Sequence, residues 1–241
     1  MSEGKLRSQV RLLACRTLGA IAFLSAVMPM AEAKSLSAAG IEGGNGVFGS
    51  VAVSMQSVPP ARRWASLLPL IVGEDFVACT SGRLCEWESS VQRAIASIHD
   101  AALFMKLEVV NRSINRGLRY QEDLENYGQL DHWAAPRETM ERGRGDCEDY
   151  AILKMAALKA AGVPIDDMSV VVVKDKRRNV HHAVLAVLTP KGNFILDSLT
   201  DKVLSDQLVH RYEPLYSVGT RGLWVHGFRQ SAAKRLEAEA N

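Results

Sequence analysis

Apolar residues recur at steps of three and four in the first half of the chain, at Val91, Ile95, Ile98, Ala102, Met105 and Val109. This spacing predicts one amphipathic helix from about residue 89, with residues 111–120 leading out of it. The stretch before it, residues 61–87, shows no such period, and we expect it to be irregular.

A second helix is predicted to begin beside Cys147. Asp146 stands at the N-cap position and acidic residues fill the first turn, while Gly162, followed by Pro164, marks the end of the helix. A shorter helical turn precedes it and begins at Pro136.

Beyond this helix the pattern changes to that of strands. Residues 168–175 (MSVVVVKD) are strongly β-branched, and residues 179–188 and 193–201 are two further strands joined by the short turn TPKG. Residues 222–229 are another candidate strand. Because helices precede strands, the order predicts an α+β domain in which a helix packs on an antiparallel sheet.

The N-terminus differs from the rest of the chain. Residues 1–33 combine a basic start, a short apolar run and an Ala-Glu-Ala ending, the pattern of a cleaved secretory signal. The alternative is an uncleaved anchor, although the run is shorter than the roughly 20 residues that span a bilayer. Residues 34–60 are rich in Gly, Ser and Ala and predict a flexible lead-in, with a short strand at residues 47–55. The domain itself is then expected to occupy residues 61–241.

The net charge of the chain falls to zero when the predicted signal is removed. The whole chain has 29 basic and 27 acidic residues, and residues 1–33 hold four of the former and two of the latter, which leaves 25 of each. A neutral chain gives no reason to expect nucleic acid as a partner. We therefore expect one exported domain, located in the periplasm of a bacterium.

Cysteine usage in an oxidising compartment is informative. Without Cys15 the chain keeps Cys79, Cys85 and Cys147, an odd number. Cys79 and Cys85 are six residues apart around a Ser-Gly turn, and we expect a disulfide between them. Cys147 would then be the unpaired thiol, either a buried structural cysteine or a functional one.

A thiol at a helix start can serve as a nucleophile if it loses its proton. The helix N-terminus favours an anion, a histidine can accept the proton, and a carboxylate can orient that histidine. A hairpin turn centred on residues 191 and 192 pairs His182 with position 201, and His181 then points to the other face. Asp197 and Asp201 share the face of His182. This register places Asp201 nearer, and a bulge or a wider loop would be needed to bring Asp197 alongside, so spacing alone does not choose between them.

Several motifs occur together between residues 109 and 204. They are Val110-Asn111, Tyr127-Gly128, Asp131, Trp133, Pro136, Glu138, Gly-Asp-Cys-Glu-Asp-Tyr at residues 145–150, His-Ala-Val-Leu-Ala at 182–186 and Leu-Asp-Ser-Leu at 196–199. In this arrangement the sequence resembles the bacterial transglutaminase-like cysteine proteinases, the LapG-type family.

The resemblance implies a papain-like core of the transglutaminase type. It implies that Cys147 is the nucleophile, that His182 is the general base and then the acid, and that Asp197, rather than Asp201, orients the imidazole. The chain departs from the family at Ser198, where an asparagine is frequent.

The resemblance also implies a calcium ion close to the nucleophile. Members of the family bind calcium through the carboxylates that flank the cysteine, and these are Asp146 and Glu148 here. Calcium prefers carboxylate and carbonyl oxygens. From the residues alone, the same acidic side chains could simply cap the helix and complement its dipole. Asp131 is a further candidate ligand whose spacing fixes no position.

Taken together, these features predict a periplasmic, calcium-dependent cysteine endopeptidase. The resemblance implies that its substrate is an exported or surface protein, in particular a large adhesin whose release affects biofilm attachment. It also implies inhibition by a membrane-bound receptor that senses a cyclic dinucleotide. The alternatives are a transglutaminase-like acyltransferase or amidase, and a non-catalytic module that binds calcium or a partner.

Overall fold

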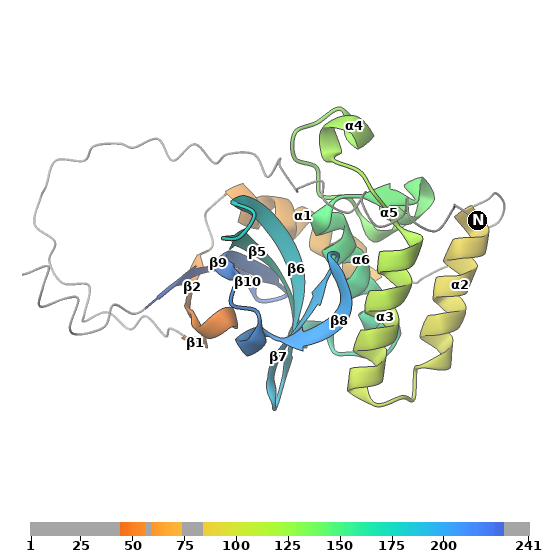
Figure 1. Cartoon of the computed structure of the whole chain (residues 1–241). Coiled ribbons are helices and arrows are strands. Elements are labelled where there is room, and N and C mark those ends of the chain that lie inside the picture. The colour runs from red at the N-terminus through yellow and green to blue at the C-terminus, as the bar shows by residue number, and fades with distance from the viewer. Residues whose placement is uncertain (1–43, 56–58, 74–83, 229–241) are drawn as a thin grey trace, which may run out of the picture.

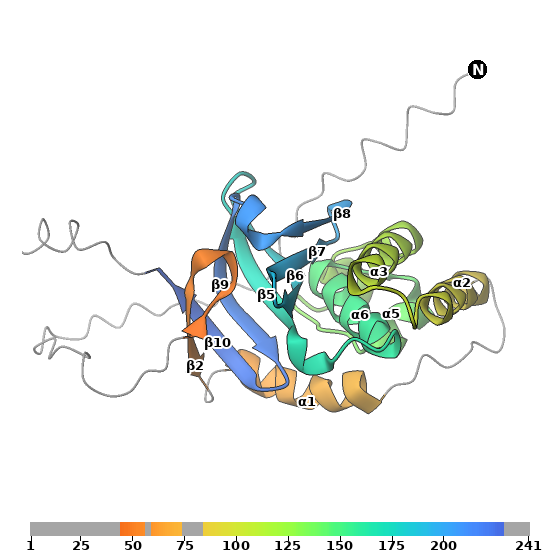
Figure 2. The same cartoon turned by 90° about the horizontal axis from the view of Figure 1, so that it is seen from below.

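The computed structural model describes residues 44–55, 59–73 and 84–228. Eight strands form one sheet in the order β1-β2-β10-β9-β5-β6-β7-β8, and every neighbouring pair is antiparallel. The helices stand to one side of this sheet (Figures 1 and 2). The predicted α+β class, with a helix on an antiparallel sheet, is therefore confirmed.

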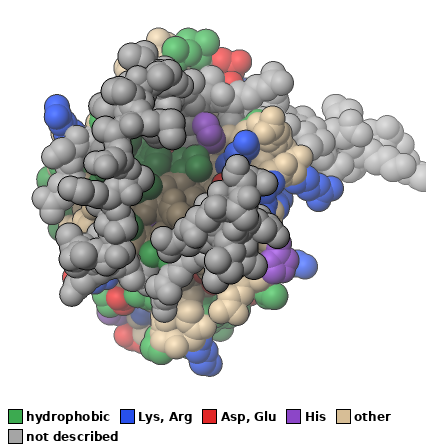
Figure 3. Space-filling view, turned by 90° about the vertical axis from the view of Figure 1, so that its left-hand side faces the viewer, with side chains coloured by type: hydrophobic (Ala, Val, Ile, Leu, Met, Phe, Trp, Pro, Cys, Tyr) green, Lys and Arg blue, Asp and Glu red, His purple; other side chains and the backbone are tan. Residues whose placement is uncertain are grey.

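The sheet contains the predicted strands and several others. Its members are β1 (Gly44–Asn45), β2 (Val51–Met55), β5 (Met168–Asp175), β6 (Val180–Thr189), β7 (Gly192–Asp197), β8 (Thr200–Ser205), β9 (Tyr212–Gly219) and β10 (Gly222–Gly227). The strand expected within residues 47–55 is β2, and it pairs along β10, so the sheet begins before the predicted domain boundary at residue 61. From the side of these two strands, hydrophobic side chains are visible at the centre of the surface (Figure 3).

Two helix predictions for the first half of the chain are wrong. The single helix expected from residue 89 is two helices, α2 (Leu84–Ser97) and α3 (Leu103–Gly117), which lie side by side (Figure 1). The chain turns back between them, where the amide of Ala101 donates a hydrogen bond to the carbonyl of Ile98 at 2.9 Å. Both helices bury an apolar face in the same core, so their apolar residues together follow a spacing that resembles that of one longer helix.

The stretch expected to be irregular contains a helix, α1 (Pro59–Gly73). Its buried side chains are Trp64, Leu67 and Ile71, which follow one another at helical spacing. The helix was missed because the exposed positions around them are also apolar, among them Leu70 and Val72. Two short helices, α4 (Asp123–Tyr127) and α5 (Pro136–Arg142), follow α3, and Gly143 ends α5 with a φ of 62°.

The central element is α6 (Cys147–Ala160), whose first twelve residues are all buried. A helix that is buried on every side has neighbours on every side, and α6 lies between the sheet and α3 (Figures 1 and 2). The predicted start at Cys147 and the stop at Gly162, with a φ of +82°, are both confirmed.

Both faces of the central strands are covered. Odd-numbered residues of β6, such as Ala183 and Leu185, join the large core on the side of the helices, whereas Val184 and Ala186 join a smaller cluster on the other face. Segments next to the two outer strands meet on that face, where the amide of Phe48 donates to the Asp206 carboxylate at 2.9 Å. This double burial explains why β5 and β6 are almost continuously apolar in sequence.

The β6–β7 hairpin differs from its predicted register by two residues. Thr189 pairs with Gly192 and Leu185 with Leu196, so the turn is centred on residues 190 and 191. The Thr189 hydroxyl donates to the carbonyl of Gly192 at 2.8 Å and accepts from the amide of Lys191 at 3.1 Å, which fixes this turn. A shift of two leaves each side chain on its predicted face.

Some predictions fall outside the described residues. They include the signal at residues 1–33, Cys79, and the side chain of Cys85. The Cys79–Cys85 disulfide therefore stays a prediction. No helix within residues 44–55, 59–73 and 84–228 is long and apolar enough to cross a membrane.

Candidate active site

Cys147 is the first residue of α6, and a short strand pair fixes the backbone that leads into it. Strand β4 (Arg144–Gly145) runs parallel to β3 (Arg119–Tyr120), and the amide of Gln121 donates to the carbonyl of Gly145 at 3.0 Å. The chain at the end of α3 thereby holds the residues just before the cysteine.

Gly145 makes room for an acidic side chain of the helix. A Cβ atom at this position would lie 2.6 Å from both the Cβ and the Oδ2 atom of Asp149. No side chain fits such a distance, so the glycine before Asp146 is a requirement for the observed position of Asp149.

The Cys147 side chain is fully buried. Its Sγ atom lies 3.1 Å from Glu148 Oε2. The sulfur is disulfide-bonded in this structure. The prediction that Cys147 is unpaired is therefore wrong for the structure. Because the thiolate is the nucleophilic form, any chemistry at this sulfur requires the reduced protein.

His182 and Asp197 form a buried pair. His182 Nε2 lies 2.8 Å from Asp197 Oδ1, and the two residues are 1% and 3% exposed. Since an ionised carboxylate only accepts hydrogen bonds, the proton of the neutral ring is on Nε2. The other ring nitrogen, Nδ1, is buried and has no hydrogen-bond partner in the described part of the chain. It is therefore the nitrogen that can accept a proton.

Asp201, the competing candidate, makes different contacts. It pairs with Arg116 at 3.1 Å, and its side chain is 29% exposed. Extending the observed hairpin register places His182 opposite residue 199, so Asp197 is a diagonal neighbour on the same face. The structure thus joins His182 to Asp197, as the resemblance implied.

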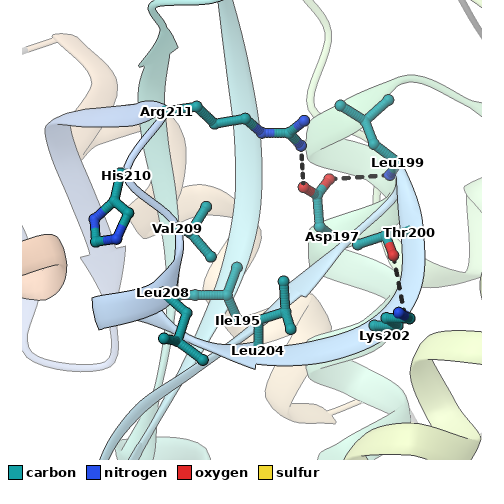
Figure 4. A pocket seen from close by; sticks show the side chains of 10 residues that line it. All are labelled: Ile195, Asp197, Leu199, Thr200, Lys202, Leu204, Leu208, Val209, His210 and Arg211. Atoms are coloured by element: carbon teal, nitrogen blue, oxygen red, sulfur yellow. Dashed lines mark hydrogen bonds and ion pairs between the residues drawn. The ribbon is translucent and has the colours of Figure 1, made fainter.

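The second oxygen of Asp197 is held by two residues that sequence reasoning missed. The Tyr212 hydroxyl donates to Oδ2 at 2.5 Å, and Arg211 Nη2 donates to the same atom at 3.1 Å. On the other side the amide of Leu199 donates to Oδ1 at 3.0 Å. Figure 4 shows the contacts with Arg211 and Leu199 beside an open pocket of about 340 Å³.

These contacts set the charge of the Asp197 carboxyl. Burial by itself would raise its pKa, but the charge of His182 and the hydrogen bonds from His182, Tyr212 and Leu199 outweigh burial and lower the pKa well below its usual range. The residue is therefore a carboxylate at every pH at which the protein is expected to work.

The topology brings Cys147 and His182 toward the same end of the sheet, but His182 packs on Tyr212 of the smaller cluster, whereas Cys147 belongs to the large core on the side of the helices. The chain leaves the far end of α6 and enters β5 at Met168, which pairs with Val187 near the end of β6. The 14 residues of α6 extend back by about 21 Å, and Val187 lies about 17 Å from His182 along the strand. No hydrogen bond joins Cys147 to His182 among the described residues, and a disulfide sulfur has no proton to share with the ring.

Five carboxylates gather around Cys147. Asp146 and Glu148 flank Cys147, and Asp123, Asp131 and Asp149 join them, in groups whose oxygen atoms lie within 4.8 Å of one another. Four of the five side chains are buried. Each of the five keeps one oxygen that has no hydrogen-bond partner in the described part of the chain. Unsatisfied oxygens that converge in this way fit a hard cation such as calcium.

The remaining oxygens of this cluster hold the surrounding chain. Asp149 Oδ1 accepts from the amide of Ala134 at 2.9 Å, Asp123 accepts from the amide of His132, and Asp131 pairs with Arg63 of α1. The cluster therefore connects α4, which begins at Asp123, and the loop that carries Asp131 to the start of α6.

Helix capping does not explain Asp146. Asp146 occupies the N-cap position, yet its side chain makes no capping hydrogen bond. Burial and the mutual repulsion of the carboxylates raise the pKa values of Asp146, Glu148 and Asp149 well above their usual range, and burial raises that of Asp123 to about 6. A cluster that resists ionisation so strongly is one that a cation would stabilise.

The chain is similar to known proteins in sequence and in fold. Residues 77–226 match the family described as bacterial transglutaminase-like cysteine proteinase. A solved structure of LapG from Legionella pneumophila is similar, with 29% identity and a TM-score of 0.55, over 72% of this chain and 91% of that one. The EGTA-treated form of the same protein is 29% identical, with a TM-score of 0.56, over 70% of this chain and 88% of that one. The calcium-bound form is 27% identical, with a TM-score of 0.56, over 74% of this chain and 99% of that one. Among curated proteins, none matches the chain.

Proposed function

Because the chain belongs to the bacterial transglutaminase-like cysteine proteinases, a family of cysteine peptidases, we propose that it is a calcium-dependent endopeptidase that uses Cys147, His182 and Asp197 as its triad. One observation carries the proposal. His182 is held by Asp197 through Nε2 at 2.8 Å and keeps a buried, unpartnered Nδ1, at the end of the sheet where the helix of Cys147 begins.

The chemistry follows from this arrangement once Cys147 is reduced. His182 Nδ1 accepts the thiol proton, and Asp197 stabilises the imidazolium that results. The thiolate attacks the carbonyl carbon of the peptide bond, and His182 returns the proton to the leaving amine. Water then attacks the acyl-enzyme and gives up a proton to His182, which restores the thiol and releases the new carboxyl terminus.

The acidic cluster is the calcium site in this proposal. Asp146 and Glu148, the predicted ligands, would hold the ion together with Asp123, Asp131 and Asp149. Each of these three also has one carboxylate oxygen without a hydrogen-bond partner in the described part of the chain, which a cation would satisfy. Calcium-bound and EGTA-treated forms of the Legionella protein support this reading. Bound calcium supplies positive charge that offsets the carboxylates around the sulfur and ties their loop to α6.

We place the enzyme in the periplasm and its substrate among exported surface proteins. The support is the basic, then apolar, residues 1–33 and the family resemblance of residues 109–204. On the same ground, the substrate we propose is an adhesin whose cleavage loosens a biofilm, and the regulator is a membrane-bound receptor for a cyclic dinucleotide.

The proposal is tested with the chain from residue 34 onward, reduced and supplied with calcium. It should cleave an exported adhesin of the same bacterium, and Cys147→Ala should abolish the cleavage. His182→Ala should reduce it strongly, whereas His181→Ala, a change of the adjacent and half-exposed histidine, should not. Cleavage that survives Cys147→Ala would refute the proposal. Attachment of an added amine to the substrate, without hydrolysis, would instead establish acyl transfer.

A further inference from the structure

The carboxylate of Asp197 accepts four hydrogen bonds, two at each oxygen. At Oδ1 the donors are His182 Nε2 at 2.8 Å and the amide of Leu199 at 3.0 Å. At Oδ2 they are the Tyr212 hydroxyl at 2.5 Å and Arg211 Nη2 at 3.1 Å. A carboxylate offers about four lone-pair positions, so this one is saturated and can neither rotate nor take up a proton without losing a bond.

Tyr212 touches both members of the pair. While its hydroxyl donates to Asp197, its ring packs on the ring of His182 with centroids 5.6 Å apart, and on Phe48 at 5.9 Å. The hydroxyl in turn accepts a hydrogen bond from Arg211. Since that oxygen is already occupied as an acceptor by the guanidinium, its own proton is directed to Asp197.

Arg211 connects Asp197 to the strand pair that carries the histidine. Its Nε lies 3.9 Å from the fully buried carboxylate of Asp175, and that carboxylate accepts hydrogen bonds from the amides of Arg177 and Arg178 in the β5–β6 turn. The carbonyl of Arg211 also accepts from the amide of Lys176 at 2.9 Å. One side chain therefore holds the turn just before β6 and the end of β7 at a fixed separation.

We propose that Tyr212 and Arg211 are positioning residues, which hold Asp197 in one orientation and thereby keep the proton of neutral His182 on Nε2. This role rests on the proposed function of the His182–Asp197 pair. With Oδ2 fixed, Oδ1 faces Nε2, and Nδ1 stays free to accept the proton of the thiol. Without Tyr212 or Arg211, the carboxylate can turn, and the competing tautomer, with the proton on Nδ1, becomes populated.

The first test is kinetic. Tyr212→Phe keeps the ring and removes only the hydroxyl. Arg211→Lys keeps the positive charge but removes the planar guanidinium group with its several N–H donors. Each should lower kcat by about 10- to 100-fold and leave KM within about threefold, the effect of a lost orienting partner. Arg211→Met should be worse than Arg211→Lys. Tyr150→Phe is the matched control, because it also removes a buried phenol hydrogen bond, to the carbonyl of Leu118 at 2.6 Å.

The second test reads the tautomer directly and needs no substrate. In a Cys147→Ala background, the ¹⁵N shifts of the neutral His182 ring should report a proton on Nε2. Adding Tyr212→Phe should produce a mixture of tautomers, and adding Tyr150→Phe should not. An unchanged tautomer together with an unchanged kcat would overturn the proposal. If the parent protein proves to have no peptidase activity, the proposed function fails, and the shifts alone still decide whether Tyr212 fixes the proton.

Discussion

Replacing Asp197 by asparagine tests the site most severely, because the two side chains have the same shape. An amide has one oxygen, so its NH₂ group must face one of the two pairs of donors that Asp197 now satisfies. If the NH₂ faces His182, Nε2 has to become the acceptor, and the ring proton moves to Nδ1. If it faces Tyr212 and Arg211, the guanidinium loses its buried anion.

The magnitude follows from which ring nitrogen carries the proton. With the proton on Nδ1, His182 cannot accept another from Cys147, and general-base catalysis is lost. A wrong tautomer in a comparable triad lowers kcat by about 10⁴-fold, so we expect a loss of about 10³- to 10⁴-fold, or about 4–5.5 kcal/mol in the barrier. The free energy of unfolding should fall by about 1.5–3 kcal/mol, the value of one charged hydrogen bond.

The pH dependence of this stability loss has a definite sign. The pKa of Asp197 is lowered in the folded protein, so its contribution is present above its unfolded pKa of about 3.9 and is lost as pH falls through the lower folded value. The difference in stability between the parent and Asp197→Asn should therefore be constant above about pH 5 and should shrink below pH 4.

Steady-state cleavage and thermal unfolding, each compared with Asp201→Asn, provide the assay. Asp201 is the neighbouring aspartate that pairs with Arg116 near the surface, and its replacement should change kcat by less than about threefold. If Asp201→Asn were as damaging as Asp197→Asn, or if Asp197→Asn kept more than a tenth of the parent kcat, the assignment of Asp197 would be refuted.

Three further predictions concern the surroundings of the proposed triad. Chelation of calcium should lower the melting temperature more at pH 8 than at pH 5. The pKa values of the acidic cluster are raised in the folded protein, to about 6 for Asp123, so the calcium-free protein loses stability as the pH rises from about 4. An equal effect at both pH values would contradict a metal role for these acids. Gly145→Ala should abolish calcium-dependent stabilisation and lower the free energy of unfolding by about 1–3 kcal/mol, because the new Cβ atom would lie 2.6 Å from Asp149. The control variant Gly73→Ala, with open space around the new Cβ atom, should melt at the same temperature as the parent. Lys154→Met should raise the melting temperature at pH 7 by at least about 2–4 °C, because burial lowers the pKa of this lysine to about 7 and the charged form is costly in the core; a lower melting temperature would show that the amine supports the fold.

The positions of Cys147, His182 and Asp197 in the fold were predictable because they depend on short, specific motifs. The helix start at Cys147 has local signals on both sides, and β6 and β7 are read from their apolar alternation. The choice between Asp197 and Asp201 was not predictable from spacing. It depends on a turn fixed by the side chain of Thr189, and a turn centre that differs by one residue moves the pairing by two.

The remaining parts of the site depend on contacts between distant segments. Asp123 lies 24 positions before Cys147 in a short helix with no period of its own, and it joins the acidic cluster only through the fold. Arg211 and Tyr212 stand at the start of β9, which carries Pro214 and was not recognised as a strand. The break between α2 and α3 contains neither glycine nor proline, so the sequence has no helix-breaking residue that would mark it.

The central claim is that His182 activates Cys147, and alkylation measures this directly. Reduced, calcium-loaded protein should react with iodoacetamide at Cys147, identified by mass spectrometry, faster at neutral pH than an ordinary thiol does. His182→Ala should slow the reaction at least tenfold, and His181→Ala should leave its rate unchanged. Equal rates in the parent and in His182→Ala would show that the imidazole does not ionise this sulfur, and the triad would have to be abandoned.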